Sequence, residues 1–171
     1  MAKMNSFFIR ATVNGGKAGA FAQTEIDIGS YTDLGSSKPE ILRIHNVQVA
    51  LTNSSGLVPN MAADTASSAA WQITTQTQSG LVLIDDRSFV SVGRGGFRNP
   101  DSATEPPSQV FDAQVLAQDY TNGYLVAVPT LYLGALGGDS FADDVIITVM
   151  LECTTEPATK ASAVSLAVSQ M

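Results

Sequence analysis

The residues best suited to catalysis in this chain are its single histidine, His45, and its single cysteine, Cys153. A serine or cysteine nucleophile needs a base beside it, so His45 would have to serve any such site. The sequence contains no GxSxG motif, and one histidine is too few for a metal site built from several. Both residues lie in strand-like segments, which predicts a hydrogen-bonded sheet histidine and a buried core cysteine.

Two acidic pairs, Asp85 with Asp86 and Asp143 with Asp144, supply oxygens of the kind that a calcium ion requires. Adjacent carboxylates in a strand point to opposite faces, and the spaced acidic residues of a calcium-binding loop are absent. The sequence therefore predicts solvated turn acids, with Arg87 as a partner for the first pair. No metal ion or other cofactor is expected.

The segment GRGGFRN, residues 93–99, is similar to a glycine-rich phosphate loop. It lacks the GK[ST] ending and a following helix, so its glycines indicate backbone freedom rather than phosphate binding. Residues 93–108 include prolines and few apolar anchors, which predicts a long loop of the kind that often forms interfaces. We therefore expect Phe97, flanked by Arg94 and Arg98, to anchor a contact with a neighbouring subunit.

Alternation of apolar and polar residues with a period of two recurs along most of the chain and predicts strands. These strands span 6–13, 21–28, 41–52, 71–78, 81–84, 87–92, 109–117, 124–133 and 144–154. Pro129 lies inside one of them and predicts an edge strand, a bulge or two short strands there. Residues 53–70, with a helical turn, and 93–108 are predicted to be long loops, and 158–171 has no assigned element.

The predicted strands indicate one domain, residues 1–171, folded as an antiparallel two-sheet sandwich. Long connections are expected where strands cross between sheets, which favours a single jelly roll. An immunoglobulin-like sandwich is the alternative, and the position of Trp71 does not separate the two. The expected core consists of Ile44, Val47, Val49, Leu51, Trp71, Ile73, Val145, Ile147, Val149 and Leu151.

The outward positions of these strands carry Thr, Ser, Gln and Asn, and only 15% of all residues are charged. Such a neutral surface suits contact with neighbouring copies, because interface centres are depleted of charge. The net charge is −7 and no stretch concentrates Lys or Arg, so direct nucleic acid binding is not expected. The opening MAKMNSFFIRATV is too polar for a signal peptide or a membrane span, which predicts synthesis in a cytoplasm.

The compact size, neutral strands, long loops and absence of catalytic residues resemble those of single jelly-roll major capsid proteins of tailless icosahedral viruses of bacteria and archaea. The resemblance implies a virion protein, made in the host cytoplasm, that associates laterally into homo-oligomeric capsomers. Shells of this family commonly enclose an internal membrane. Before Phe7 the chain has only Lys3 in place of a basic arm, so its inner surface would face lipid or other virion proteins.

Three classes of function fit these observations. The first is a self-assembling capsid protein, favoured by the low charge density and the long loops. The second is another non-enzymatic β-sandwich module, such as a phage tail, decoration or adhesin-like binding protein. The third, an enzyme, would need a site built from Asp, Glu and Arg, and it is not expected.

Overall fold

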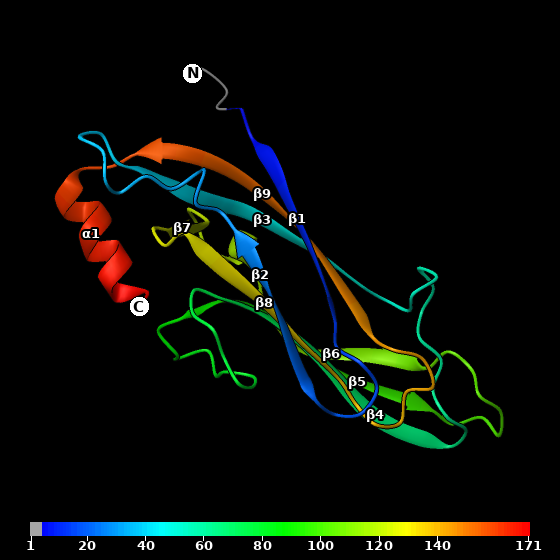
Figure 1. Ribbon diagram of the computed structural model, residues 1–171. Coiled ribbons are helices and arrows are strands. Elements are labelled where there is room, and N and C mark those ends of the chain that lie inside the picture. Colours follow the sequence, from blue (N-terminus) through cyan, green and yellow to red (C-terminus); the bar gives the residue numbers. More distant parts are fainter. Residues whose placement is uncertain (1–4) are drawn as a thin grey trace.

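Two antiparallel β-sheets pack face to face in the computed structural model, which describes residues 5–171 apart from the side chains of 109–113 (Figure 1). The four-stranded sheet contains, in spatial order, β1 (Phe7–Asn14), β9 (Ile146–Pro157), β3 (Glu40–Thr52) and β7 (Tyr124–Val126). The five-stranded sheet contains β2 (Phe21–Asp27), β8 (Thr130–Gly137), β4 (Thr65–Thr74), β5 (Phe89–Asn99) and β6 (Ser108–Val115). A short 3-10 helix, η1 (Ala117–Asp119), follows β6, and an α-helix, α1 (Lys160–Ser169), follows β9.

The chain crosses between the two sheets at most of its connections, so strands that are distant in sequence lie side by side. Strand β9 lies between β1 and β3, and β8 lies between β2 and β4. This order is that of a jelly roll, with β6 as an additional strand beside β5. The predicted antiparallel sandwich of jelly-roll type is therefore confirmed. The immunoglobulin-like alternative does not have this strand order.

The space between the sheets is filled by side chains from alternating strand positions, which point to one face of each sheet. In β9, Ile147 and Val149 are fully buried, whereas Thr148 between them is exposed. The predicted core residues lie in one cluster between the sheets. Val49 and Leu51 are half-buried at its margin, and the other predicted members are buried.

Strands β4 and β5 pair through small side chains, with Ser68 opposite Gly96. The two loops predicted over 53–70 and 93–108 are therefore wrong where they overlap these strands. Runs of Ala, Ser and Gly show no apolar-polar alternation, so a periodicity argument cannot detect a strand made of them. One small residue is required in this pair, because a side chain at Gly93 would overlap the Trp71 indole, whereas Gly96 has open space beside it.

The segment between β4 and β5, residues 75–88, folds back over the outer face of the five-stranded sheet and is called the covering loop below. The buried side chain of Gln72 in β4 fastens it there. Its Nε2 donates to the Gly80 carbonyl at 2.9 Å, and its Oε1 accepts from the Val82 amide at 2.8 Å. Val82 also packs on Phe89 in a small second core on this face.

The covering loop accounts for two errors in the predicted strands. The strand predicted over 71–78 ends at Thr74, and the one predicted over 81–84 is part of the covering loop. The polar side chains of Gln72 and Thr74 suggested a solvated strand face, but both are buried by residues of the same chain. The segment 124–133 forms two strands, β7 and β8, separated around Pro129, which confirms one of the three arrangements predicted for it.

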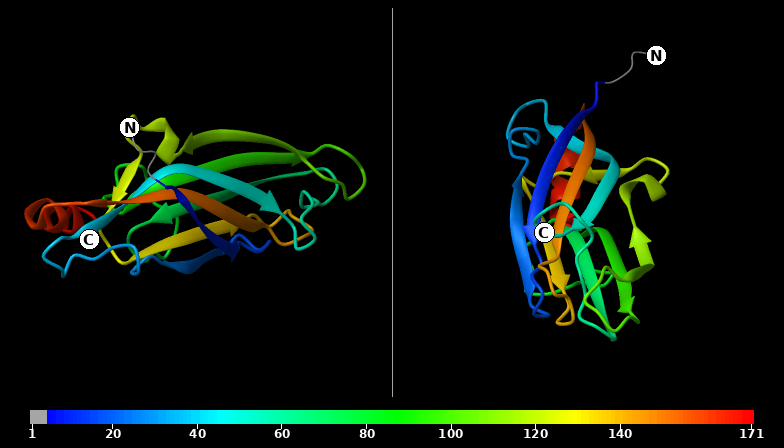
Figure 2. Two further views of the ribbon diagram at one scale, coloured as in Figure 1. Left: turned by 90° about the horizontal axis from the view of Figure 1, so that it is seen from above. Right: turned by 90° about the vertical axis from the view of Figure 1, so that its right-hand side faces the viewer.

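The tail 158–171 contains α1, an element that the sequence did not predict. Thr159 caps the first turn of the helix, and Ala163 and Ala167 pack on Ile41 of β3. In the view from above, Figure 2 shows α1 at one end of the sandwich, beyond the strands. The helix therefore closes this end of the core.

Gln170, just after α1, ties the helix to the sandwich through both its side chain and its backbone. Its Oε1 accepts from the Ala127 amide at 3.0 Å, and its Nε2 donates to the Leu125 carbonyl at 2.6 Å. Its own carbonyl accepts from Thr75 Oγ1 at 2.6 Å and from Gln76 Nε2 at 3.1 Å. One buried residue thus joins α1, the β7–β8 connection and the covering loop.

Replacing Gln170 with alanine is expected to lower the free energy of unfolding by about 1–3 kcal/mol, the usual cost of leaving buried polar groups unpaired. The Ala127 amide and the Leu125 carbonyl would both lose their partner. Urea denaturation of the two proteins measures the difference. Ser169→Ala, at an exposed position next to it, is the control and should change stability by less than about 0.5 kcal/mol. Equal effects of the two substitutions would contradict this role for Gln170.

Candidate assembly surfaces

The outer face of the four-stranded sheet is mostly neutral and polar. Thr12 Oγ1 and Thr148 Oγ1 lie 3.3 Å apart across β1 and β9, and Gln48 Nε2 donates to Asn46 Oδ1 at 2.9 Å. Two charged residues lie on this face: Arg10, whose guanidinium lies over the Phe8 ring, and Glu152, which is opposite Phe8 in β9. A face with few charges can be covered by another protein with little desolvation cost.

The free edge of β1 is a second surface suited to assembly. In the described part of the chain, β1 pairs only with β9, and its register runs from Phe7 to Asn14 without a bulge. The strand contains no proline and a single charged residue, Arg10. Proline, bulges and clustered charges are the features that usually protect an edge from pairing. This edge can therefore accept another extended segment.

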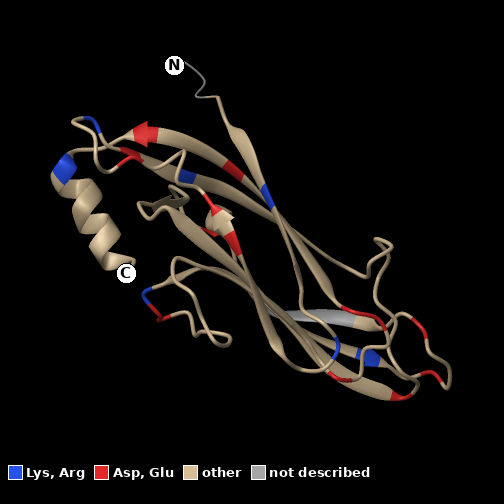
Figure 3. Ribbon diagram, viewed as in Figure 1, with Lys and Arg blue, Asp and Glu red and all other residues tan. Residues whose placement is uncertain are grey.

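Acidic side chains gather at one end of the sandwich (Figure 3), where the β3–β4, β5–β6 and β8–β9 connections meet. Short backbone contacts hold these loops together, since Met61 bridges to both Glu105 and Phe141, and the Asp64 amide donates to the Asp101 carbonyl at 3.0 Å. Lys17 also lies at this end, where its Nζ donates to the Ala142 carbonyl at 2.8 Å. Acidic side chains nevertheless prevail there among the described residues, and an excess of carboxylates repels phosphate groups.

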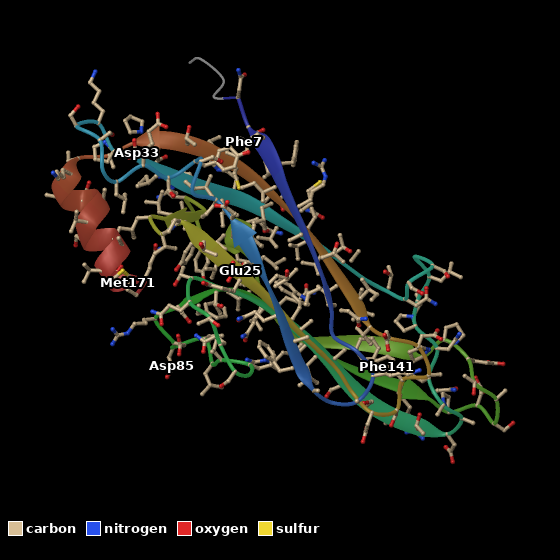
Figure 4. The ribbon with its side chains drawn as sticks, in the orientation of Figure 1. Phe7, Glu25, Asp33, Asp85, Phe141 and Met171 are labelled. Carbon is tan, nitrogen blue, oxygen red and sulfur yellow. The ribbon has the colours of Figure 1, made fainter. Side chains whose placement is uncertain are left out.

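Exposed apolar side chains gather at the opposite end, which carries α1 and the covering loop. They are Leu83, Ile84, Val164, Val168 and Met171. Figure 4 labels Asp85 and Met171 at this end and Phe141 at the acidic end. Arg87 Nη1 donates to the Met171 carbonyl at 3.3 Å and so joins the loop to the residue after the helix. The sequence signal for this surface was a tail with no charged residue after Lys160.

Two adjoining hollows of about 530 and 470 Å³ flank the turn that follows η1. Arg43 and Tyr120 line both of them. Arg43 forms an ion pair with Glu156 at 2.7 Å, and the hydrogen bond and charge of that carboxylate raise the pKa of the guanidinium. Tyr124 lies beside Tyr120, and burial raises the pKa of its hydroxyl.

His45 borders one hollow and belongs to a β-bulge in β3, where the pairing with β9 shifts between Ile44 and Asn46. Its Nε2 lies 2.8 Å from Thr154 Oγ1. The prediction of a hydrogen-bonded sheet histidine is therefore confirmed. Cys153 is buried in the core between the sheets, so the two side chains occupy different faces of the sheet and form no dyad.

Burial, together with the charge of Glu152, raises the pKa of the Cys153 thiol to about 12. At neutral pH the thiol is therefore protonated and a poor nucleophile. The predicted core cysteine is confirmed.

A thiol reagent such as an aromatic disulfide is expected to leave native Cys153 unmodified at neutral pH and to modify it fully after unfolding in guanidinium. The physical reason is that both the buried position and the raised pKa suppress the thiolate. Absorbance of the released thiol measures the reaction. Rapid modification of the folded protein would contradict the position assigned to this residue.

The acidic pairs form local hydrogen bonds rather than an ion site. Asp143 accepts from the Asn60 amide at 3.0 Å and from Asn53 Nδ2 at 3.2 Å, and these bonds lower the pKa of its carboxyl group. Asp86 accepts from Ser88 Oγ at 2.6 Å, which lowers its pKa in the same way. Among the described residues, no three His, Cys, Asp or Glu side chains come together as a metal site.

The three residues predicted to form an interface lie in β5 and not in a loop. Phe97 is 3% exposed and packs edge-on against Phe141, with 5.3 Å between ring centroids. Its predicted role as an anchor for a neighbouring subunit is therefore wrong. Arg94 is half-buried and donates to the Val82 carbonyl. Arg98 is exposed beside a shallow hollow over Gly96, and a contact with a neighbour there stays a prediction.

No helix in residues 5–171 is both long enough and apolar enough to cross a membrane.

Comparisons with known proteins agree on the fold. No family model and no curated protein matches the chain in sequence. Among solved structures, VP1 of New Jersey polyomavirus is similar with a TM-score of 0.52 and 8% identity, over 91% of this chain and 100% of that one. The Merkel cell polyomavirus virus-like particle is similar with a TM-score of 0.51 and 7% identity, over 94% of this chain and 76% of that one. This chain therefore has the jelly-roll sandwich fold seen in viral capsid proteins.

Proposed function

We propose that this protein is a structural virion protein that self-assembles laterally into a capsid shell. The observation that carries the proposal is the complete jelly-roll strand order combined with a neutral, polar outer sheet face. Two solved structures of similar fold are a viral VP1 and a virus-like particle, which supports the same function. On this proposal the chain is not an enzyme, and its partners are further copies and other virion proteins.

The proposal extends to a tailless icosahedral virus of bacteria or archaea, with synthesis in the host cytoplasm. The low charge density and the acidic loop end support a shell whose inner surface meets lipid or protein rather than the genome. An internal membrane is part of this proposal because shells of the resembled family commonly enclose one.

A binding module of the decoration or adhesin type is the second candidate. The hollows around Tyr120 and Arg43 favour it, because ligand pockets commonly combine aromatic side chains with a few charged or polar groups. Such a module would not need the neutral sheet face or the open edge of β1.

Light scattering and negative-stain microscopy of the purified protein test the proposal. We expect rings or closed particles whose amount rises with protein concentration. A strictly monodisperse monomer at high concentration would contradict a shell protein and favour the binding module.

A further inference from the structure

The chain contains two Asn-Gly dipeptides, Asn14-Gly15 and Asn122-Gly123. In such a dipeptide the backbone nitrogen of the glycine can attack the side-chain amide of the asparagine, because glycine has no Cβ to obstruct the approach. The product is a five-membered cyclic imide, which water opens to an acid. The reaction needs an asparagine side chain that can rotate and a glycine nitrogen that can lose its proton. The two dipeptides differ in both respects.

The first dipeptide is held firmly in the fold. Asn14 Nδ2 donates to Asp144 Oδ2 at 3.0 Å, and Asn14 Oδ1 accepts from the Gly16 amide at 2.8 Å. Gly15 is buried, and its amide donates to the Val145 carbonyl at 2.8 Å. Both reacting groups are therefore engaged, and an attack would have to break these hydrogen bonds.

The second dipeptide lies in the turn between η1 and β7, where the Gly123 amide donates to the Tyr120 carbonyl at 3.2 Å. Asn122 is exposed, and among the described residues no hydrogen bond holds its side chain. Its main-chain carbonyl accepts from Arg43 Nη1. When the Gly123 nitrogen loses its proton, the negative charge spreads onto this carbonyl oxygen through peptide resonance. A guanidinium bonded to that oxygen stabilises the reactive form of the dipeptide.

We propose that Asn122 is a site of spontaneous deamidation and that Arg43 promotes the reaction. The Gly123 nitrogen loses its proton to solvent and forms a bond with Asn122 Cγ. The bond between Cγ and the side-chain nitrogen breaks, and ammonia leaves. Water then opens the imide at either carbonyl and gives aspartate or isoaspartate. Each conversion consumes water and releases ammonia, with no oxidation or reduction.

The fold itself retains the reactive dipeptide, because Gly123 is required where it stands. Its φ is 66°, in the left-handed region that favours glycine. An added Cβ would also overlap the Ile44 carbonyl oxygen of β3. A bulkier residue after Asn122, which would slow the attack, is therefore incompatible with this turn.

Deamidation would change the surface around the two hollows. Asn122 and Arg43 line both of them, so the new carboxylate would lie where the hollows adjoin, close to an existing ion pair. Isoaspartate would in addition lengthen the main chain between η1 and β7 by a methylene group. The inference concerns the single chain and does not depend on the proposed shell function.

Peptide mass mapping of the full chain, kept unassembled in mildly alkaline buffer, tests the proposal. Trypsin cleavage after Lys17 and after Arg98 places the two asparagines on different peptides. We expect the mass gain of an amide-to-acid conversion to develop at Asn122 about tenfold faster than at Asn14, or more, because the hydrogen bonds at Asn14 must break first. Asn122→Ser should abolish the signal at that position. Equal rates in the folded protein would overturn the proposal.

The unfolded chain is the internal control. In guanidinium chloride neither dipeptide has its native hydrogen bonds, so Asn14 and Asn122 should react at similar rates. The same preference for Asn122 after unfolding would show that the fold is not its cause and would overturn the inference. Asp144→Ala removes the acceptor of Asn14 Nδ2 and should accelerate the reaction at Asn14 several-fold in the folded protein. An unchanged rate at Asn14 would contradict the protection assigned to these bonds.

A matched pair of variants tests the part played by Arg43. Arg43→Met removes the guanidinium and should slow the reaction at Asn122 about tenfold, the rate equivalent of a hydrogen bond from a charged group. Glu156→Gln removes the ion pair but keeps the arginine, and should not slow it. Circular dichroism checks that both variants are folded. An unchanged rate in folded Arg43→Met, or equal slowing in the two variants, would overturn the role of Arg43.

Discussion

Replacing Trp71 with alanine is expected to lower the free energy of unfolding by about 3–5 kcal/mol, more than most single substitutions in this chain. Trp71 is 1% exposed and is the largest fully buried side chain. Its indole lies against Gly93 of β5, where an added Cβ would come within 2.6 Å of the Trp71 Cε2 atom. Alanine would leave a cavity that the two sheets cannot close. Urea denaturation of the unassembled protein measures the loss.

Two companion measurements make this prediction specific. Trp71→Phe should cost less than Trp71→Ala because the smaller ring still fills part of the space. Gly93→Ala should also destabilise, since the new methyl group would overlap the indole. Trp71 is the only tryptophan, so its fluorescence reports this site alone. Full quenching of the native protein by an aqueous quencher would place Trp71 at the surface and contradict its assigned position.

Sequence periodicity predicted the strands whose two faces meet different environments. In β9, buried Val149 and exposed Thr148 alternate because one face contacts the core and the other contacts solvent. The same argument found only parts of β4 and β5, residues 71–74 and 89–92. It missed 65–70 and 93–99, because small residues such as Ser68 and Gly96 show no apolar-polar contrast even where the two faces differ in exposure. Gln72 is a different case, because a polar side chain is buried there under a loop.

The expectation that the chain is not an enzyme could be argued from the sequence because it depends on residue counts. One histidine and one cysteine limit the chemistry wherever they lie, and the fold then placed His45 and Cys153 on different faces. The candidate assembly surfaces depend instead on which strands are edges and on where α1 packs. Those are properties of the topology, which a local sequence pattern does not contain.

The loop predicted over 93–108 was wrong at residues 93–99 for a physical reason. Glycines and prolines indicated a loop, and an aromatic ring in a loop must find a partner elsewhere. In the structure these glycines instead lie within β5, where Gly95 and Gly96 pair with Ala69 and Ser68 of β4, and Phe97 is buried in the core. Phe97 therefore stabilises the fold of its own chain, whereas a contact of Arg98 with a neighbouring subunit stays a prediction.

Phe97→Ala is accordingly expected to lower the free energy of unfolding by about 3–5 kcal/mol, because it removes a buried ring that contacts Phe141. Arg98→Ala, one residue away on the exposed face, should change stability by less than about 0.5 kcal/mol. Denaturation curves and particle yields of both variants show which face of β5 stabilises the fold and which face contributes to assembly. A stable but assembly-deficient Phe97→Ala would restore the anchor interpretation. A stable but assembly-deficient Arg98→Ala would show that this strand contributes to the core through one face and to the shell through the other.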